Sequence, residues 1–557
     1  MRIIIGCSLI AIGIILLLVF FEPVFSGLAV MAGIIICFIP KKEQKEPEKP
    51  APVEPPEPKS PFSDLYEEAN LLSGKGLAVG WERTAKINGV RPKGDWLKYN
   101  GDRHLITIGP TGSGKGSTQQ IVTLLWDRAS SLVIDVKGQL CAVTTRYRAE
   151  KAGHKVVCLN PFGVLGLPTS TYNPLAHIDP HSITFDSDCL RIAEGLVDIK
   201  KADHWEISAL EVVTILIMWV VKYEDEKSLI KVRQLLNLPD DLRKELFKKI
   251  ARCDNSILAE GADRYTSDSR EVRDCIQTAV VQLGFLRNAA VERVLRGNEI
   301  SFADLKRKKM TVYVIIPPEL LHTHGKFLRL IVMSALGELL GERTQPDEPV
   351  LFMLDEFAQL GRMDLIENAA SVVRDYKIRL WIVLQNIPQL KALYIEKWES
   401  FLSSAGIIQL FTPNDMETAE YFSKRSGIHN VKRFGASESS SSGRSSGHNP
   451  GGESSGFNWS SGVSFTTTIV EAPICTPQDI LGMQRWGQLL FCDGISSAIF
   501  ACRGPYWELK FINDDAGQDP YHMTTEERAE FEAHARQSKT LPDAVKTYLS
   551  FLDQDEN

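Results

Sequence analysis

The chain has 557 residues, which is more than one folded core usually contains, so two or more folded units are expected. Its net charge of -7 excludes a general electrostatic attraction to nucleic acid, so any contact with DNA must come from local patches or the lining of a pore. The ten cysteines show no Cys-x-x-Cys spacing, which favours reduced thiols in a cytosolic body and gives a structural metal site little support.

The first 40 residues hold two apolar runs, separated only by Glu22 and Pro23. Residues 3–21 approach the roughly 20 residues that span a bilayer, and residues 24–39 form a shorter run. Basic residues stand outside both runs (Arg2, Lys41 and Lys42), so the lysine and arginine bias places both termini in the cytoplasm. We therefore predict a transmembrane helical hairpin over residues 1–40 in a bacterial inner membrane. A cleaved signal peptide is the alternative, disfavoured because no small-residue cleavage site precedes the second run.

The remaining chain alternates apolar runs with helical patterns, after a Pro-, Glu- and Lys-rich linker at residues 41–61. Runs at residues 104–108, 131–136, 155–160, 310–317, 350–357, 378–385 and 407–411 are typical of strands. We expect an α/β fold, a RecA-like P-loop domain with a parallel sheet and helices on both faces. The domain is predicted in two parts, residues 62–176 and residues 304–515, with an all-α domain inserted at residues 177–303.

A glycine-rich loop follows the first of these runs and reads Gly-Pro-Thr-Gly-Ser-Gly-Lys over residues 109–115. Ile121, Leu124 and Leu125 continue it with helical spacing, so the loop stands between a strand and a helix. In that context its backbone N–H groups and the positive end of the helix surround phosphate oxygens, and the lysine reaches the β and γ phosphates. The loop predicts ATP binding by Gly109, Pro110, Thr111, Gly112, Ser113, Gly114, Lys115, Gly116 and Ser117.

Two carboxylates end the apolar run of residues 350–356, which reads Val-Leu-Phe-Met-Leu-Asp-Glu. A run that is apolar on both faces suits a central parallel strand, and its carboxyl end is where a nucleotide binds. We expect Asp355 to hold Mg²⁺ through water and Glu356 to polarise the attacking water. The alternative is a buried strand that ends in a solvated acidic turn.

The position after the loop lysine departs from the general P-loop, because Gly116 replaces the usual Ser or Thr that binds Mg²⁺. The next hydroxyl, Ser117, lies about 100° further around the helix. Two ways of holding the metal stay open: Ser117 reaches it after a local adjustment, or water held by Asp355 fills the gap.

The last part of the chain contains three recognisable segments. Residues 436–462 are dominated by Ser and Gly, and we interpret them as a mobile loop or tether. Residues 487–503 predict two strands joined at Asp493-Gly494, a strong hairpin dipeptide. Residues 516–557 are mildly acidic and helical in pattern, which indicates a solvated terminal helix or, alternatively, a docking tail for a partner.

Taken together, these motifs resemble the type IV secretion coupling proteins of the TraG type, which are membrane-anchored hexameric ATPases that feed substrates to a conjugation or secretion channel. The resemblance covers nearly the whole chain. Its carriers are Gly-Asp-Arg-His at 101–104 ahead of the loop, Asp-Val-Lys-Gly at 135–138, Asn-Pro-Phe at 160–162, Tyr-Asn-Pro-Leu at 172–175, Asp-Glu-Phe at 355–357, Leu-Gly at 360–361, Gln385, and Gln-Leu at 389–390. The family often has Gly after the loop lysine, and it usually has Pro where this chain has Val136.

The resemblance implies a nucleotide bound between neighbouring subunits of a ring, with Lys115 on phosphate and Asp355 and Glu356 serving metal and water. Gln385 would sense the γ phosphate, because a side-chain amide both donates and accepts; its alternative is a polar cap at a strand end.

A ring also allows an arginine of the next subunit to stabilise transition-state charge. Arg374 is our candidate, Arg379 and Arg425 are further ones, and a plain surface arginine is the alternative. Asp135 and Lys137 either lie near the nucleotide or form a structural ion pair.

The function that follows is a membrane-anchored, ATP-hydrolysing coupling protein with ATP and Mg²⁺ as cofactors. As a homo-hexamer in contact with inner-membrane lipid, it would drive relaxase-bound single-stranded DNA, effector proteins or both into the components of a type IV channel. The sequence leaves the choice of cargo open. The alternatives are a translocase of related fold on double-stranded DNA and a docking receptor that does not hydrolyse nucleotide.

Overall fold

The computed structural model describes residues 69–72, 76–82, 96–199, 203–369, 373–449 and 452–545. Contacts divide the chain into two units, residues 1–61 and residues 62–557, and every described residue belongs to the second. The predicted transmembrane hairpin and the linker lie outside the described residues.

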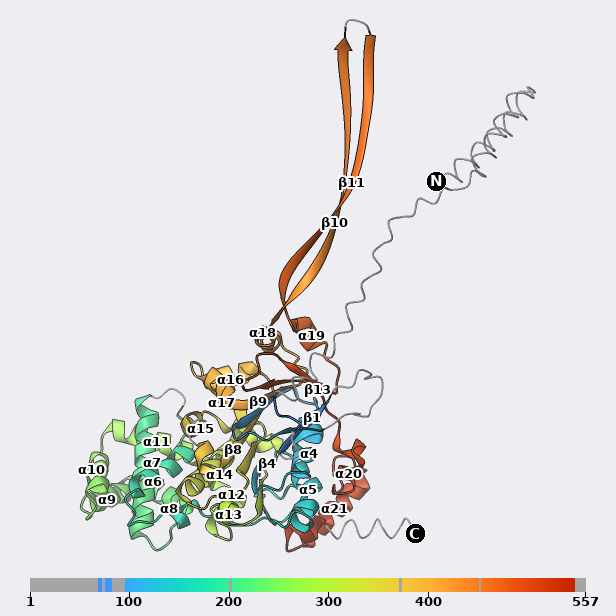
Figure 1. Cartoon of the computed structure of the whole chain (residues 1–557). Helices are drawn as coiled ribbons and strands as arrows, with labels where there is room; N and C mark the ends of the chain where they lie inside the picture. Colours follow the sequence, from blue (N-terminus) through green and yellow to red (C-terminus); the bar gives the residue numbers. More distant parts are fainter. Residues whose placement is uncertain are drawn as a thin grey trace, which may run out of the picture. The chain divides into compact units, whose positions relative to one another are not determined.

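An 11-stranded mixed sheet forms the centre of the second unit (Figure 1). Its strands, in spatial order, are β2 (Trp96–Tyr99), β1 (Leu77–Glu82), β13 (Ile499–Cys502), β12 (Gly487–Cys492), β9 (Ala405–Leu410), β3 (His104–Ile108), β8 (Ile378–Leu384), β7 (Val350–Leu354), β4 (Ser131–Ile134), β6 (Met310–Val314) and β5 (Lys155–Leu159). From β9 to β5 all neighbouring strands are parallel. The RecA-like α/β class expected from the sequence is therefore present.

Four antiparallel strands extend the sheet beyond β9, so the expectation of a parallel sheet was incomplete. Two of them, β12 and β13, are the strands predicted on either side of Asp493-Gly494, and Gly494 has the positive φ of 81° that such a turn needs. The other two, β1 and β2, were not predicted. β1 contains Gly80, which weakens a strand pattern, and the ladder between β1 and β2 shifts register between Ala78 and Gly80.

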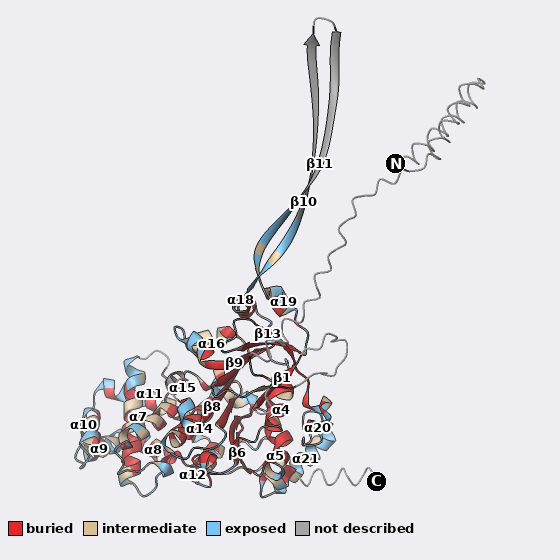
Figure 2. Cartoon of the chain, in the orientation of Figure 1, coloured by how far each residue is buried: buried red, intermediate tan, exposed pale blue. Residues whose placement is uncertain are grey.

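Helices cover both faces of the parallel strands. Successive residues of each strand point to opposite faces of the sheet, and both sets are apolar, so each face needs a covering layer. On β7, Phe352 and Leu354 belong to one apolar core with α6 (Phe185–Leu196), α7 (His204–Tyr223) and α14 (Leu321–Gly341). Leu351 and Met353 belong to the other core with α4 (Ile121–Leu124) and α5 (Gln139–Glu150). Figure 2 shows the resulting concentration of buried residues in the sheet.

The segment between β5 and β6 is helical throughout its described residues. Besides α6 and α7 it contains α8 (Leu229–Leu236), α9 (Asp240–Ile250), α10 (Ser256–Asp263), α11 (Arg270–Gln282) and α12 (Ala289–Arg296). Helix α7 is the one described helix that is long and apolar enough to cross a membrane, and 61% of its most apolar window is buried in the protein.

The remaining described α-helices are short: one directly precedes β6, five lie between β7 and β12, and two follow β13. They are α13 (Asp304–Arg307), α15 (Asp364–Ala369), α16 (Ile387–Leu393), α17 (Trp398–Ser404), α18 (Met416–Arg425), α19 (Pro477–Leu481), α20 (Lys510–Asn513) and α21 (Thr525–Gln537).

The Ser- and Gly-rich segment, interpreted as a mobile loop or tether over residues 436–462, forms a β-hairpin in its described residues, which composition did not predict. β10 (Ile428–Asn449) pairs with β11 (Gly452–Pro473) in one antiparallel ladder, from Ile428 opposite Pro473 to Asn449 opposite Gly452. Figure 1 shows the hairpin extending away from α18 and α19. The composition argument considered only the burial of side chains, whereas a ladder is held by backbone groups of any residue except proline.

The C-terminal segment, expected to be a solvated terminal helix or a docking tail, contains α21, most of whose residues are exposed, and it packs on the protein through a few side chains as far as Val545. Phe531 and Ala535 of α21 are buried in the core that covers α5, together with Leu541 and Ala544. The acidic residues that suggested solvation occupy the outer face of the same helix.

Candidate functional site

The glycine-rich loop lies where the sequence placed it, between β3 and a helical segment that begins at Gly116. Gly112 and Gly114 have φ angles of 80° and 87°, which L side chains rarely adopt, so the loop requires glycine at both positions. The Gly109 N–H donates to the Leu384 carbonyl at 3.0 Å, which fixes the start of the loop to the end of β8.

Lys115 is 9% exposed, and its Nζ donates to the Gly109 carbonyl at 2.6 Å. Burial lowers the pKa of Lys115, and the nearby carboxylates of Asp355 and Glu356 act against that shift. The ammonium group is thus held at the loop by a neutral oxygen, which it can exchange for a phosphate oxygen.

Asp355 and Glu356 follow β7, and β7, β8 and β3 are consecutive parallel strands, so the acidic pair and the loop share one edge of the sheet. Burial raises the pKa of Asp355, the Glu356 charge adds to the rise, and Gln120 and Lys115 lower it. Glu356 has a φ of 51°, a strained backbone conformation for this residue. Asp355 is only partly exposed and its charge interacts with Lys115, which favours a place in the site over the alternative of a solvated acidic turn.

Gln385 joins this group from the end of β8. Its Nε2 donates to Glu356 Oε2 at 3.0 Å, and its backbone N–H donates to Gln389 Oε1 at 3.1 Å. Four predicted residues therefore converge at one edge of the sheet: Lys115, Asp355, Glu356 and Gln385.

The side chains near the loop suit a magnesium ion that keeps several waters. Ser117 Oγ donates to the Gly114 carbonyl at 3.4 Å, so the hydroxyl already lies beside the loop backbone. Among the described residues no group of three His, Cys, Asp or Glu side chains could hold a metal alone. One carboxylate and one hydroxyl, completed by phosphate and water oxygens, fit the preference of Mg²⁺ for few protein ligands.

Asp135 caps a helix rather than pairing with Lys137. Its carboxylate accepts the N–H of Cys141 at 2.8 Å and the N–H of Lys137 at 3.3 Å, at the start of α5. Burial raises the pKa of Asp135 to about 7, and the Asp355 charge contributes to the rise. The Lys137 Nζ lies over the ring of Tyr521, 5.8 Å from its centroid.

The candidate arginines do not reach the loop within one chain. Arg374 precedes β8, and its Nε lies 3.5 Å from a carboxylate oxygen of Asp102, which precedes β3, so both stand at the opposite edge of the sheet. Arg379 is buried and donates to the Gly101 carbonyl at the same edge. Arg425 is exposed at the end of α18.

Sequence reasoning missed Arg503, which directly follows β13 and is 2% exposed. Its Nη1 donates to the Ser113 carbonyl of the loop at 2.6 Å. An arginine after a short strand carries no motif, so only the position of β13 beside the loop identifies it.

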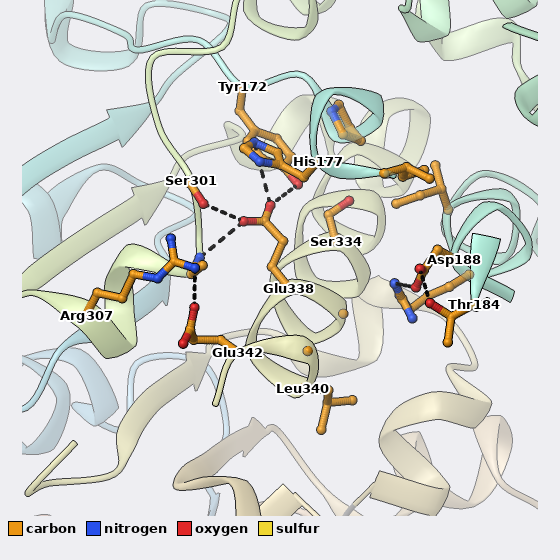
Figure 3. Close-up of a pocket in the computed structure, with 17 residues that line it drawn as sticks. Tyr172, His177, Thr184, Asp188, Ser301, Arg307, Ser334, Glu338, Leu340 and Glu342 are labelled. Carbon is orange, nitrogen blue, oxygen red and sulfur yellow. Dashed lines mark hydrogen bonds and ion pairs between the residues drawn. The ribbon is translucent and has the colours of Figure 1, made fainter. Parts of the chain in front are cut away.

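A separate cavity of about 470 Å³ lies between the Tyr-Asn-Pro-Leu segment, α6 and α14 (Figure 3). Glu338 lies in its middle and accepts hydrogen bonds from the Tyr172 hydroxyl and the Ser301 hydroxyl, both at 2.8 Å. Arg307 forms an ion pair with Glu342 at its rim. These polar groups form hydrogen bonds and ion pairs with one another. We therefore interpret the Tyr172 motif as a structural junction between the helical segment and the sheet domain.

Residues 63–530 match the family model described as "Type IV secretory system Conjugative DNA transfer". The conjugal transfer protein TraG of Escherichia coli is 26% identical over 415 residues, which are 70% of this chain and 63% of that protein. The protein VirD4 of Agrobacterium fabrum is 28% identical over 358 residues, which are 62% of this chain and 53% of that protein. The chain thus spans less than two thirds of the length of these relatives.

Solved structures of the bacterial conjugative coupling protein TrwB share the fold. The unbound form of TrwB lacking its first 70 residues has a TM-score of 0.56 and 15% identity, covering 79% of this chain and 90% of that chain. The complex of TrwB with ADP and Mg²⁺ has a TM-score of 0.54 and 16% identity, covering 72% of this chain and 84% of that chain.

Proposed function

The chain belongs to the family of type IV secretory system conjugative DNA transfer proteins, and we propose that it is an ATP-hydrolysing coupling protein. The observation that carries the proposal is the convergence of Lys115, Asp355, Glu356 and Gln385 at the edge of the sheet where the glycine-rich loop begins. A buried lysine, a partly exposed carboxylate and a second carboxylate bound by an amide, all beside such a loop, are parts that nucleotide hydrolysis uses.

The loop residues 109–117 bind the phosphates of ATP. Lys115 leaves the Gly109 carbonyl and takes a phosphate oxygen, which exchanges a hydrogen bond to a neutral acceptor for a stronger one to a charged acceptor. Asp355 and Ser117 would hold Mg²⁺, which when bound neutralises phosphate charge.

Glu356 acts on the attacking water. Gln385 donates to one of its carboxylate oxygens, which leaves the other oxygen to accept a proton from water. Gln385 thereby orients the base. It also lies beside the position of the γ phosphate, so hydrolysis changes its contacts, and this change is passed on to α16, which begins at Ile387.

The arginine that completes the site comes from a neighbouring copy in a homo-hexamer. Arg374 lies at the sheet edge opposite the loop, with 43% of its side chain exposed, so it is free to reach the loop of another subunit. Arg379 is excluded from this role because its guanidinium is buried against the Gly101 carbonyl.

Two spans over residues 1–40 anchor the ring in the inner membrane with both termini in the cytoplasm. There the protein receives relaxase-bound single-stranded DNA, effector proteins or both, and ATP hydrolysis moves them into a type IV channel.

A transfer assay tests the proposal in cells. Donor cells that lack the chromosomal or plasmid copy of this chain are complemented with the wild type or with Lys115→Ala, and transfer of marked DNA is counted. The wild type restores transfer, whereas Lys115→Ala does not, although both accumulate to the same level. If Lys115→Ala restored transfer as well as the wild type does, ATP hydrolysis would not be required, and the chain would be a docking receptor only.

A further inference from the structure

Arg503 connects the turn before β12 to the glycine-rich loop. Its Nη2 donates to the Arg485 carbonyl at 2.6 Å and its Nε donates to the Gly487 carbonyl at 3.2 Å. On the other side its Nη1 donates to the Ser113 carbonyl at 2.6 Å and approaches the Thr118 hydroxyl at 3.3 Å. One guanidinium therefore holds two segments that are far apart in the sequence.

The contact with the Ser113 carbonyl fixes the direction of one peptide group. In a trans peptide the C=O and the following N–H point in opposite directions, so the Gly114 N–H points away from Arg503. Among the described residues no protein acceptor receives this N–H. It is therefore available to a phosphate oxygen on the inner side of the loop.

The next peptide group, Gly114–Lys115, is fixed by Thr118, the residue that Arg503 also contacts. The Thr118 hydroxyl donates to the Gly114 carbonyl at 2.7 Å, and the Thr118 N–H donates to the same oxygen at 2.9 Å. Ser113 Oγ, in the same loop, is buried without a hydrogen-bond partner among the described residues. A buried hydroxyl without a partner is costly unless a ligand satisfies it.

The charge of Arg503 is also unusual. Within the described part of the chain no carboxylate forms an ion pair with it, and the charges of Arg485 and Lys115, both positive, lie close enough to interact with it. Its guanidinium lies 3.6 Å from the ring centroid of Phe411, a contact that stabilises a cation only in part. A buried charge of this kind destabilises the protein until an opposite charge compensates it.

We propose that Arg503 is a positioning residue of the phosphate site, which holds the Ser113–Gly114 peptide in the phosphate-binding direction and keeps a positive charge beneath the loop for an anionic polyphosphate. The proposal rests on nucleotide binding by residues 109–117, and it adds a residue from a strand that no P-loop motif includes.

The test measures ADP affinity of the full-length chain by calorimetry, at a temperature where circular dichroism shows each variant folded. Arg503→Gln removes the positive charge and the guanidinium that bonds both segments, and we expect ADP binding to weaken by about tenfold or more. Arg503→Lys keeps the charge but cannot bond both segments, so its affinity lies between those of Arg503→Gln and the wild type. Arg270→Gln is the matched control, since it removes an exposed arginine charge at the start of α11; its ADP affinity stays within about twofold of the wild type.

ADP affinity of folded Arg503→Gln within about twofold of the wild type would overturn the proposal, because a merely structural arginine changes stability and not affinity. Should Arg503→Gln not fold, Arg503→Lys decides in its place: affinity weakened by about threefold or more supports the proposal, and unchanged affinity overturns it. Lys115→Ala separates the two levels. If neither the wild type nor Lys115→Ala binds ADP, nucleotide binding by the loop is refuted, and the Arg503 proposal with it. If the wild type binds ADP and Lys115→Ala does not, nucleotide binding holds, and the Arg503 variants test the Arg503 proposal separately.

Discussion

Gln385 Nε2 donates to Glu356 Oε2 at 3.0 Å, which joins the carboxyl ends of the adjacent strands β8 and β7. The two residues are 29 positions apart in the chain, and neither belongs to the glycine-rich loop. The bond couples Glu356, which we propose acts on the attacking water, to the helix that follows β8. Several consequences can be measured.

Gln385→Ala removes the donor that orients Glu356. We expect ATP hydrolysis to fall by roughly ten- to a hundredfold while ADP affinity changes by less than about twofold, because the phosphate contacts remain. Steady-state hydrolysis and ADP titration measure the two effects. Lys391→Ala, on the exposed side of α16 where Lys391 pairs with Glu417, is the control and should leave both unchanged. Equal losses in binding and hydrolysis would show that Gln385 only supports the fold.

Glu356→Gln keeps the size of the side chain and removes the base. Hydrolysis should fall by about 10²- to 10⁴-fold, and ATP should bind at least as tightly as before, since one negative charge beside the phosphates is gone. A filter-binding assay with labelled ATP shows whether the variant retains the unhydrolysed nucleotide. Glu245→Gln, which neutralises an exposed carboxylate of α9 paired only with Lys248 among the described residues, should behave like the wild type. Full hydrolysis by Glu356→Gln would remove Glu356 from the mechanism.

Arg374→Ala tests the supply of an arginine by a neighbouring subunit. Hydrolysis should fall by about 10³-fold or more, whereas ADP affinity of the individual chain should not change, because Arg374 lies away from its own loop. Mixing Arg374→Ala with Lys115→Ala forms rings in which an intact loop meets an intact arginine, and partial activity should return. Mixed rings that are as inactive as either parent would contradict the assignment.

Asp135 makes stability depend on pH. Its pKa is about 7 in the folded protein and near 3.8 in an unfolded chain, so between these values the folded state binds the proton more tightly. Its contribution to the free energy of unfolding is therefore present below about pH 4 and is lost as the pH rises to about 7. The loss is on the order of a few kcal/mol.

The comparison of wild type with Asp135→Asn isolates this effect. Burial lowers the pKa of His154 to about 3, and that group changes stability in the opposite direction over much of the same range. In the wild type the two effects offset each other between pH 5 and pH 7, whereas in Asp135→Asn only the His154 effect remains, so its urea midpoint should rise from pH 5 to pH 7 by more than that of the wild type. An identical pH dependence in both proteins would mean that the Asp135 carboxylate is charged throughout.

The sequence was sufficient for the parts of the site that depend on local pattern. The glycine-rich loop and the acidic end of β7 each combine a motif with a buried strand, and parallel strands bring their carboxyl ends to one edge. Asp135 and Lys137 show the limit of this reasoning, since spacing alone allowed an ion pair and the structure shows a helix cap.

Other features depend on contacts between distant segments. Arg503 lies 390 positions from Ser113, and the residues next to it in the sequence form no motif that predicts the contact. The hairpin of β10 and β11 was missed because Ser and Gly suggest disorder by composition, although backbone pairing does not depend on it. The packing of the C-terminal segment could not be predicted, because only a few of its side chains, such as Phe531, are buried.

The rate of ATP hydrolysis by the full-length chain, with and without single-stranded DNA and beside Lys115→Ala, tests the central claim most directly. We predict hydrolysis by the wild type, a faster rate when DNA is present, and a rate for Lys115→Ala that is lower by about 10²-fold or more. A wild type that binds ATP and hydrolyses it no faster than Lys115→Ala, with or without DNA, would contradict the account.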